Sequence, residues 1–216
     1  SAEDVNNICV LLQGSSHKES VFGRFGANDE SLKKGARLVD GVSSPASQRM
    51  CGLRYIDLSH NKLSDEQCSY IISAAAMNSP LEGLELKGND IHRGLYFCPV
   101  LEKYVSSRQC RLLHLGVSSN GIINSTFRTI LDCCRNDSSL TSLDLSNNGL
   151  TSSDKNSSRV REFLKSNITL RILNLSHNRF TYGMTRIFHL GLLENDSLIL
   201  LRLDGNISLN EREMYL

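Results

Sequence analysis

The chain has 216 residues, of which 40% are hydrophobic and 6% aromatic, and its formal net charge is +1. Because the charge is near neutral and lysine and arginine form no cluster, we expect no general electrostatic binding to nucleic acid or anionic lipid. No segment approaches the roughly 18 consecutive apolar residues of a membrane-spanning helix, so we expect no membrane insertion.

Residues 1–52 carry two segments in which apolar residues have helical spacing, at 4–13 and 31–41, and a short predicted strand at 19–25. Phe22 and Phe25 in that strand have the spacing of the first two leucines of the repeats that follow. A stack of repeats exposes leucine at its end unless a terminal unit covers it. We therefore expect residues 1–52 to be a degenerate repeat that acts as an N-terminal cap.

From residue 53 to residue 209 the pattern L-x-x-L-x-L-x-x-N-x-L recurs, mostly every 28 to 30 residues. The third unit departs from it, because Gly116–Ser119 follow Leu113-His114-Leu115 before Asn120, two residues more than the pattern has. We expect a bulged turn there. The six units begin at Leu53, Leu81, Cys110, Leu140, Leu170 and Leu198.

Each unit starts with alternating leucines, which predict a short strand whose leucines all point to one side. The asparagine that follows can donate to and accept from backbone groups left unpaired by the turn. In a stack of units these asparagines would form a ladder beside a parallel sheet. The predicted ladder is Asn61, Asn89, Asn120, Asn148, Asn178 and Asn206.

The second half of each unit must cross back to start the next parallel strand. Apolar residues at helical spacing predict helices at 65–78, 124–135, 158–165 and 182–194. Pro99 predicts a helix in the second unit that starts late or kinks. The polar run 151–158 is expected to be a flexible loop.

Residues 210–216 follow the last legible unit and have no obvious capping pattern. We expect them to begin a C-terminal cap or a further segment, which would make this chain a piece of a longer protein.

A repeat of this length, with a full helix in each unit, resembles the ribonuclease-inhibitor class of leucine-rich repeats. The resemblance covers residues 53–209. It implies an α/β solenoid that is curved, with a parallel sheet on the concave face and helices on the convex face. The class is built for interaction with other proteins, so the resemblance implies a protein partner.

Seven cysteines occur at positions 9, 51, 68, 98, 110, 133 and 134, an odd number with irregular spacing. Cys110 takes the first leucine position of its unit, and the last two cysteines fall in one predicted helix. We interpret the cysteines as buried free thiols in a reducing compartment, which indicates a cytoplasmic setting without disulfides, with cytoskeletal association left open. Neighbouring residues on a helix point about 100° apart, so we expect one of Cys133 and Cys134 to be packed and the other partly exposed.

The sequence lacks the common catalytic, nucleotide-binding and metal-binding motifs, and its six histidines are scattered. We therefore expect no enzyme activity, cofactor, metal site or small-molecule substrate. His60 and His177 precede ladder asparagines and are assigned to the turns. Seven N-x-S/T triplets are interpreted as turn residues rather than glycosylation sites; they begin at Asn124, Asn136, Asn156, Asn167, Asn174, Asn195 and Asn206.

The functional surface is expected on the concave face, where side chains between the leucines point away from the core. Six strands spaced about 4.8 Å apart would span roughly 24 Å, enough for a helix or loop of another protein. The face is acidic over its first half and turns basic at Arg202. The predicted partner-binding residues are Tyr55, Asp57, Glu85, Leu112, His114, Asp144, Ile172, Asn174, Leu200 and Arg202.

The leading interpretation is a non-enzymatic protein–protein interaction module within a larger eukaryotic scaffold, cytoskeletal or signalling protein. Two alternatives stay open, because both occur among proteins with this class of repeat: an activating regulator of a small GTPase, and the ligand-sensing repeats of an innate immune receptor. No residue here matches the functional loops of the GTPase regulators.

Overall fold

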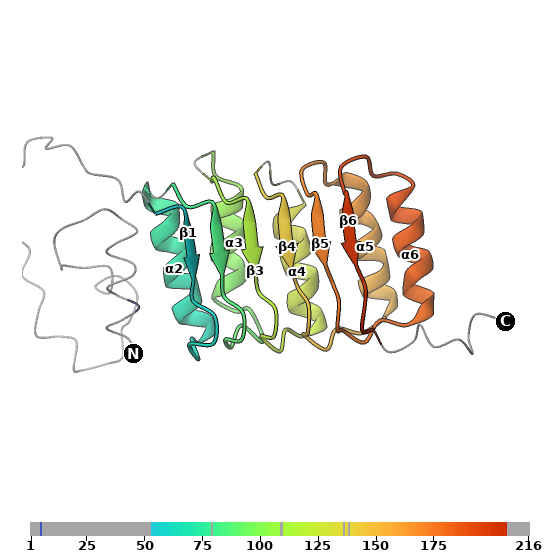
Figure 1. Ribbon diagram of the computed structural model, residues 1–216, viewed down its shortest axis with the longest axis horizontal. Helices are drawn as coiled ribbons and strands as arrows, with labels where there is room; N and C mark the ends of the chain where they lie inside the picture. Colours follow the sequence, from blue (N-terminus) through green and yellow to red (C-terminus); the bar gives the residue numbers. More distant parts are fainter. Residues whose placement is uncertain are drawn as a thin grey trace, which may run out of the picture.

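The computed structural model describes Val5, residues 53–78, 80–108 and 110–135, Asp137 and residues 139–206. The predicted N-terminal cap, except Val5, and the predicted end segment at 210–216 lie outside the described residues. In the described part, strands and helices alternate along the chain (Figure 1). In order they are β1 Tyr55–Asp57, α2 Asp65–Asn78, β2 Gly83–Glu85, α3 Phe97–Val105, β3 His114–Gly116, α4 Asn124–Cys134, β4 Ser142–Asp144, α5 Asp154–Ser166, β5 Ile172–Asn174, α6 Tyr182–Leu192 and β6 Leu200–Arg202.

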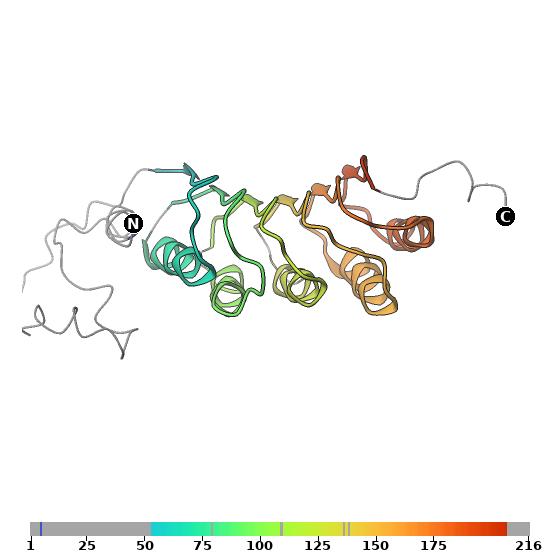
Figure 2. The same cartoon turned by 90° about the horizontal axis from the view of Figure 1, so that it is seen from below.

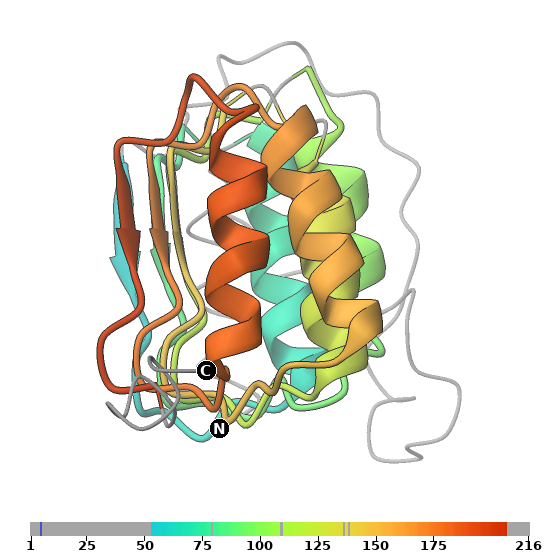
Figure 3. The ribbon, with the colours of Figure 1, turned by 90° about the vertical axis from the view of Figure 1, so that its right-hand side faces the viewer.

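The strands form one parallel sheet in the order β1-β2-β3-β4-β5-β6, so each strand pairs with the next one along the chain. The sheet lines the inner side of a shallow arc and the helices lie along its outer side (Figure 2). Viewed along the stack, sheet and helices form two layers (Figure 3). The predicted α/β solenoid, with a concave sheet and convex helices, is confirmed.

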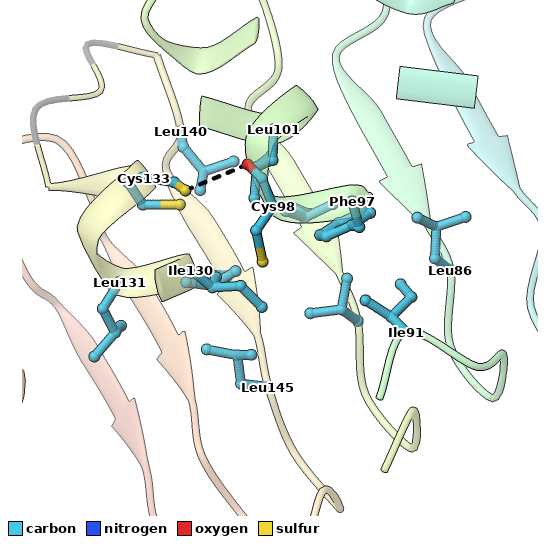
Figure 4. Close-up of a cluster of buried hydrophobic side chains, with 14 of the residues drawn as sticks. Leu86, Ile91, Phe97, Cys98, Leu101, Ile130, Leu131, Cys133, Leu140 and Leu145 are labelled. Atoms are coloured by element: carbon cyan, nitrogen blue, oxygen red, sulfur yellow. Dashed lines mark hydrogen bonds between the residues drawn. The ribbon is translucent and has the colours of Figure 1, made fainter. Parts of the chain in front are cut away.

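The core lies between these two layers. Leu81, Leu84 and Leu86 of the second unit are each 0% exposed, and the helices contribute aromatic side chains such as Phe97 and Phe127. Figure 4 shows part of this core, where strand leucines meet helix side chains from neighbouring units. Val5, from the predicted capping region, is also buried in this core.

The register of the third unit corrects the sequence interpretation. Leu84 pairs with Leu115, and Glu85 pairs with Gly116. The unit therefore begins at Leu112 rather than Cys110, and Val117 takes the place of its third leucine. With Val117 in that place, Asn120 stands at its regular distance, so the predicted bulged turn is absent.

The asparagine ladder joins each unit to the one before it, as Asn148 illustrates. Its side-chain oxygen accepts from the backbone N–H of Asn120 at 2.9 Å and of Ile122 at 3.1 Å. Its amide nitrogen donates to the carbonyls of Val117 and Leu145. Each bond replaces a backbone partner that the turn leaves missing.

The two ends of the ladder differ from its middle. Asn61 is exposed, and its amide donates only to the Ser59 carbonyl of its own turn. Asn206 is only half-buried, whereas a place in the ladder predicts a buried side chain. It still bonds Phe180, Leu175 and Leu203 like an inner member. An end unit has a described neighbour on one side only.

The turns before the ladder asparagines repeat one backbone conformation. The residue preceding the asparagine has a positive φ in every unit, and in two units it is a histidine, His60 at 59° and His177 at 54°. This confirms the assignment of both histidines to the turns.

The helices agree with the predictions, with one exception. α2 has the predicted bounds, α4 and α6 end one and two residues early, and α3 starts late with Pro99 in its first turn, where a missing N–H costs nothing. The exception is α5, which begins at Asp154, so most of the predicted loop is helical. The Ser153 hydroxyl caps it by accepting from the Asn156 N–H, and the fully buried Asn156 amide donates to Asn124 and Thr151.

The cysteines of the described residues are free, and those in the helices are buried. Cys133 and Cys134 are 7% and 1% exposed, so the expected partial exposure of one of them is wrong. α4 packs against α3 and α5 on its two flanks, which covers both side chains. Burial raises the pKa of Cys68, Cys98 and Cys133 to about 12.

Candidate functional site

A groove runs along the concave face and takes lining residues from all six units. Tyr55 and Asp57 line it at one end and Arg202 and Asp204 at the other. The complete lining is Tyr55, Asp57, Ser59, Glu85, Lys87, Ser118, Asp144, Ser146, Asn174, Ser176, His177, Arg202 and Asp204. Six of the predicted site residues are among them, and the serines, Lys87, His177 and Asp204 were not predicted.

The strand register sorts the outward residues into two columns. The first column contains Tyr55, Gly83, His114, Ser142, Ile172 and Leu200. The second contains Asp57, Glu85, Gly116, Asp144, Asn174 and Arg202.

Two predicted residues change place with the corrected third unit. His114 belongs to the first column, beside Gly83 and Ser142, and not to the column of Asp57 and Glu85. Leu112 is 0% exposed and belongs to the core, so its prediction as a partner-binding residue is wrong. The exposed leucine of that unit is Leu113, at 42%.

The glycines of the two columns make room for side chains of the preceding unit. A Cβ atom at Gly83 would overlap the Tyr55 ring, and one at Gly116 would overlap the Glu85 carboxylate. Neither glycine has a positive φ, so the lack of space for a side chain, and not the backbone conformation, explains why glycine stands at these two positions. Tyr55 and Glu85 can therefore lie flat across the neighbouring strand.

His114 is held between side chains of the two adjacent units. Its Nε2 lies 2.5 Å from Glu85 Oε1, and its Nδ1 lies 3.0 Å from Ser142 Oγ. A carboxylate only accepts, so Nε2–H donates to Glu85, and in a neutral ring Nδ1 accepts from the Ser142 hydroxyl. The Tyr55 ring stacks beside this imidazole, with ring centroids 6.4 Å apart and an angle of 20° between the planes.

The second column also has a repeated local bond. Asp57, Asp144 and Asn174 each accept, through the side chain, from the backbone N–H two residues later, at 2.8 to 3.1 Å. The bonds from Ser59 lower the pKa of Asp57, which keeps its carboxylate charged at neutral pH. These bonds hold each side chain where it lines the groove.

Apolar side chains gather at the opposite end of the face. Ile172, Ile199 and Leu200 are 38%, 79% and 44% exposed, and β5 and β6 are adjacent strands. We call these three residues the apolar strip. Ile199 was not predicted, because it stands before the strand at a position that the leucine pattern leaves unassigned.

The convex face is crossed by ion pairs between neighbouring helices. Arg135 at the end of α4 pairs with Glu162 of α5 at 2.9 Å, and Lys165 of α5 pairs with Glu194 after α6 at 2.7 Å. Such exposed pairs contribute about 0–1 kcal/mol each. These ion pairs connect adjacent units. They also neutralise charges that a partner bound to the convex face would otherwise have to pair with.

Comparison with family models agrees with this geometry. A model described as "Leucine Rich repeat" matches residues 166–183, and a second, "Leucine Rich Repeat", matches residues 52–73 and 139–159. These matches fall on the first, fourth and fifth units of the stack. The chain is a leucine-rich repeat protein.

Two solved structures match this chain at low sequence identity. One is the tropomodulin C-terminal domain from Caenorhabditis elegans, at 15% identity and a TM-score of 0.42, covering 70% of this chain and 74% of that chain. Another is the leiomodin-1 actin-binding site 2, at 15% identity and a TM-score of 0.45, covering 71% of each chain. No curated protein sequence matches the chain.

The Glu85, His114 and Ser142 side chains resemble the residue types of a hydrolytic triad, but the N–H groups of Thr141 and Ser142 both donate to the Leu113 carbonyl. They are thus unavailable to stabilise an oxyanion, which acyl transfer requires. Among the described residues, no group of three or more His, Cys, Asp or Glu side chains could hold a metal ion.

Among the helices of the described residues, none has both the length and the apolar character of a membrane-spanning segment.

Proposed function

We propose that this leucine-rich repeat protein is a non-enzymatic interaction module that holds a protein partner in the groove of its concave face. The observation that carries the proposal is the continuity of the groove, which is lined by side chains from all six units. A surface of this length offers a contact to each repeat in turn. Partner choice would then depend on the side chains between the leucines.

The fixed side chains of the first units support the same proposal. His114 is bonded on both ring nitrogens, and Tyr55 and Glu85 lie over glycines of the following units. Side chains held in one conformation lose little entropy on binding. The backbone of the strands is already paired within the sheet, so recognition falls to these side chains.

Charge reversal in the groove tests the proposal. The double variant Asp57→Lys with Asp144→Lys changes two groove residues, while Asp90→Lys with Asp196→Lys changes two exposed residues outside the groove lining. Each tagged protein is used to capture proteins from a cell lysate, which are measured by quantitative mass spectrometry. We expect to find proteins that bind to the unchanged chain and to the control variant but not to the groove variant.

Circular dichroism and thermal unfolding must show that both double variants are folded. Proteins that are captured equally by all three chains would place the binding surface outside the groove and overturn the proposal.

A further inference from the structure

The two ends of the concave face carry different chemistry, and the aromatic end has a defined geometry. Tyr55 is 54% exposed although one side of its ring lies over Gly83. The neighbouring His114 ring keeps it in a stacked arrangement. More than half of the Tyr55 surface is therefore available to the groove that it lines.

Negative charge surrounds this aromatic face. Asp57 lies two residues further on the same strand, and Glu85 lies on the adjacent strand. Burial and these two carboxylates raise the pKa of Tyr55. No ion pair joins Asp57 to a cationic side chain within the described residues, although Lys87 and His60 are near enough to lower its pKa.

An exposed aromatic face beside a carboxylate suits a planar cation. A guanidinium group can stack on the ring and donate from its edge to the carboxylate, whereas an ammonium group meets the two less well at once. Of the cationic side chains in proteins, arginine fits this end of the groove.

The opposite end of the concave face suits an apolar partner. The apolar strip of Ile172, Ile199 and Leu200 is exposed there and lies beside the groove, outside its lining. β1 and β5 are four strand spacings apart, which is about 19 Å. That distance corresponds to about 13 residues of a helix or about 6 residues of an extended chain.

From these observations, and resting on the proposed function, we infer that the partner is a protein segment that places an arginine on Tyr55 and Asp57 and aliphatic side chains on the apolar strip. A single segment laid across the strands satisfies both ends. The spacing between its arginine and its aliphatic residues reports whether it binds as a helix or as an extended chain.

A random 16-residue peptide library displayed on phage tests this inference against the folded chain. We expect enriched peptides to share an arginine separated from aliphatic residues by about 13 or about 6 positions. Enriched peptides without an arginine would overturn the inference, as would a selection that enriches nothing.

Variants of the chain then test each contact with an enriched peptide, with affinity measured by fluorescence anisotropy. Tyr55→Ala should weaken binding about tenfold, and Ile199→Ser should weaken it several-fold. Tyr182→Ala and Ile168→Ser are the matched controls, because both residues are exposed and lie away from the strands, Tyr182 at the start of α6 and Ile168 in the loop after α5. The controls should bind as the unchanged chain does.

A double-mutant cycle identifies the arginine contact. Replacing the arginine of the peptide by alanine should abolish the effect of Tyr55→Ala. If Tyr55→Ala remains equally damaging, the arginine does not lie on Tyr55 and the inference is overturned.

The same peptides separate this inference from the proposed function. Peptides that lack arginine but lose binding to the Asp57→Lys with Asp144→Lys variant would overturn the inference and leave the groove as the binding surface. Peptides that bind this variant unchanged would count against both.

Discussion

Asn148 in the ladder and Glu85 on the concave face both reach into a neighbouring unit, but they meet different kinds of partner. Asn148 bonds only backbone N–H and carbonyl groups. Glu85 bonds the imidazole of His114 and lies over Gly116. The first set of partners exists in any sequence that folds this way, whereas the second requires particular side chains.

The difference explains how one chain can combine a repeated scaffold with an individual surface. Ladder asparagines can recur in every unit because backbone groups are always present to receive them. Residues of the concave face are matched to particular neighbouring side chains, so they differ from unit to unit. Stability should therefore depend mainly on the ladder and the core, and recognition on the face.

Removing one inner ladder asparagine tests the first half of this comparison and should have the largest effect. Asn148→Ala leaves three groups of the preceding turn, the N–H groups of Asn120 and Ile122 and the Val117 carbonyl, without these partners. We expect the free energy of unfolding to fall by about 4 kcal/mol, since each unpaired buried group costs about 1–3 kcal/mol. Urea unfolding followed by circular dichroism measures this change.

Asn61→Ala is the matched control at the exposed end of the ladder. Its amide bonds one carbonyl of its own turn, so the expected cost is under about 1 kcal/mol. Equal losses in the two variants would contradict the importance of the ladder bonds between units.

The pH dependence of stability should differ between the core and the concave face. Burial raises the pKa of the Cys68, Cys98 and Cys133 thiols to about 12, whereas an unfolded thiol titrates near 8.5. The folded chain keeps these thiols neutral, so their stabilising contribution is complete below about pH 8.5 and is lost as the pH rises toward 12. We expect about 1 kcal/mol of stability to be lost per thiol and pH unit, or about 3 kcal/mol between pH 9 and 10.

Urea unfolding at a series of pH values measures this slope, and Cys98→Ala should reduce it by about 1 kcal/mol per pH unit. The Asp57 carboxylate of the face behaves in the opposite direction. Its pKa is lowered by the bonds from Ser59, so its contribution is present at neutral pH and is lost only as the pH falls through that lowered pKa. If the slope above pH 9 is unchanged by the cysteine replacement, the assignment of this slope to buried thiols is contradicted.

The parts of the fold that repeat were predictable from the sequence. The leucine spacing placed five of the six strands in register, and α2 has the predicted bounds because apolar spacing alone determines it. The third unit was misread because Val117 stands in a leucine position, and the misreading moved His114 to the wrong column and Leu112 out of the core. Substitution of one apolar residue by another leaves the packing intact but obscures the pattern.

The start of α5 and the packing over glycines could not be predicted for a different reason. Residues 151–158 are polar and have the composition of a loop, but Asn156 is buried because side chains of an adjacent unit bond it. Likewise, Gly116 becomes informative only when the register places Glu85 beside it. Contacts between units depend on pairs of positions that a single sequence does not connect.

The glycine under Glu85 gives the smallest expected effect and the most direct test of the matched pairs on the face. Gly116→Ala places a Cβ atom where the Glu85 carboxylate lies, so Glu85 must leave His114. We expect a loss of about 1 to 2 kcal/mol in the free energy of unfolding, because overpacking and a lost hydrogen bond each cost about that much. Gly183→Ala is the matched control, since it lies in α6 with open space around it and should stabilise slightly.

A double-mutant cycle with Glu85→Ala decides whether the two positions are coupled. If Glu85 and Gly116 are matched, alanine at 116 should cost little once the carboxylate is gone, giving an interaction energy of at least about 0.5 kcal/mol. Strictly additive losses would mean that Gly116 is needed for the strand itself, and the face would then be specified like the ladder. A clear coupling would mean that each unit of the face is fitted to the next, so that changing one position of the binding surface requires a compensating change one repeat away.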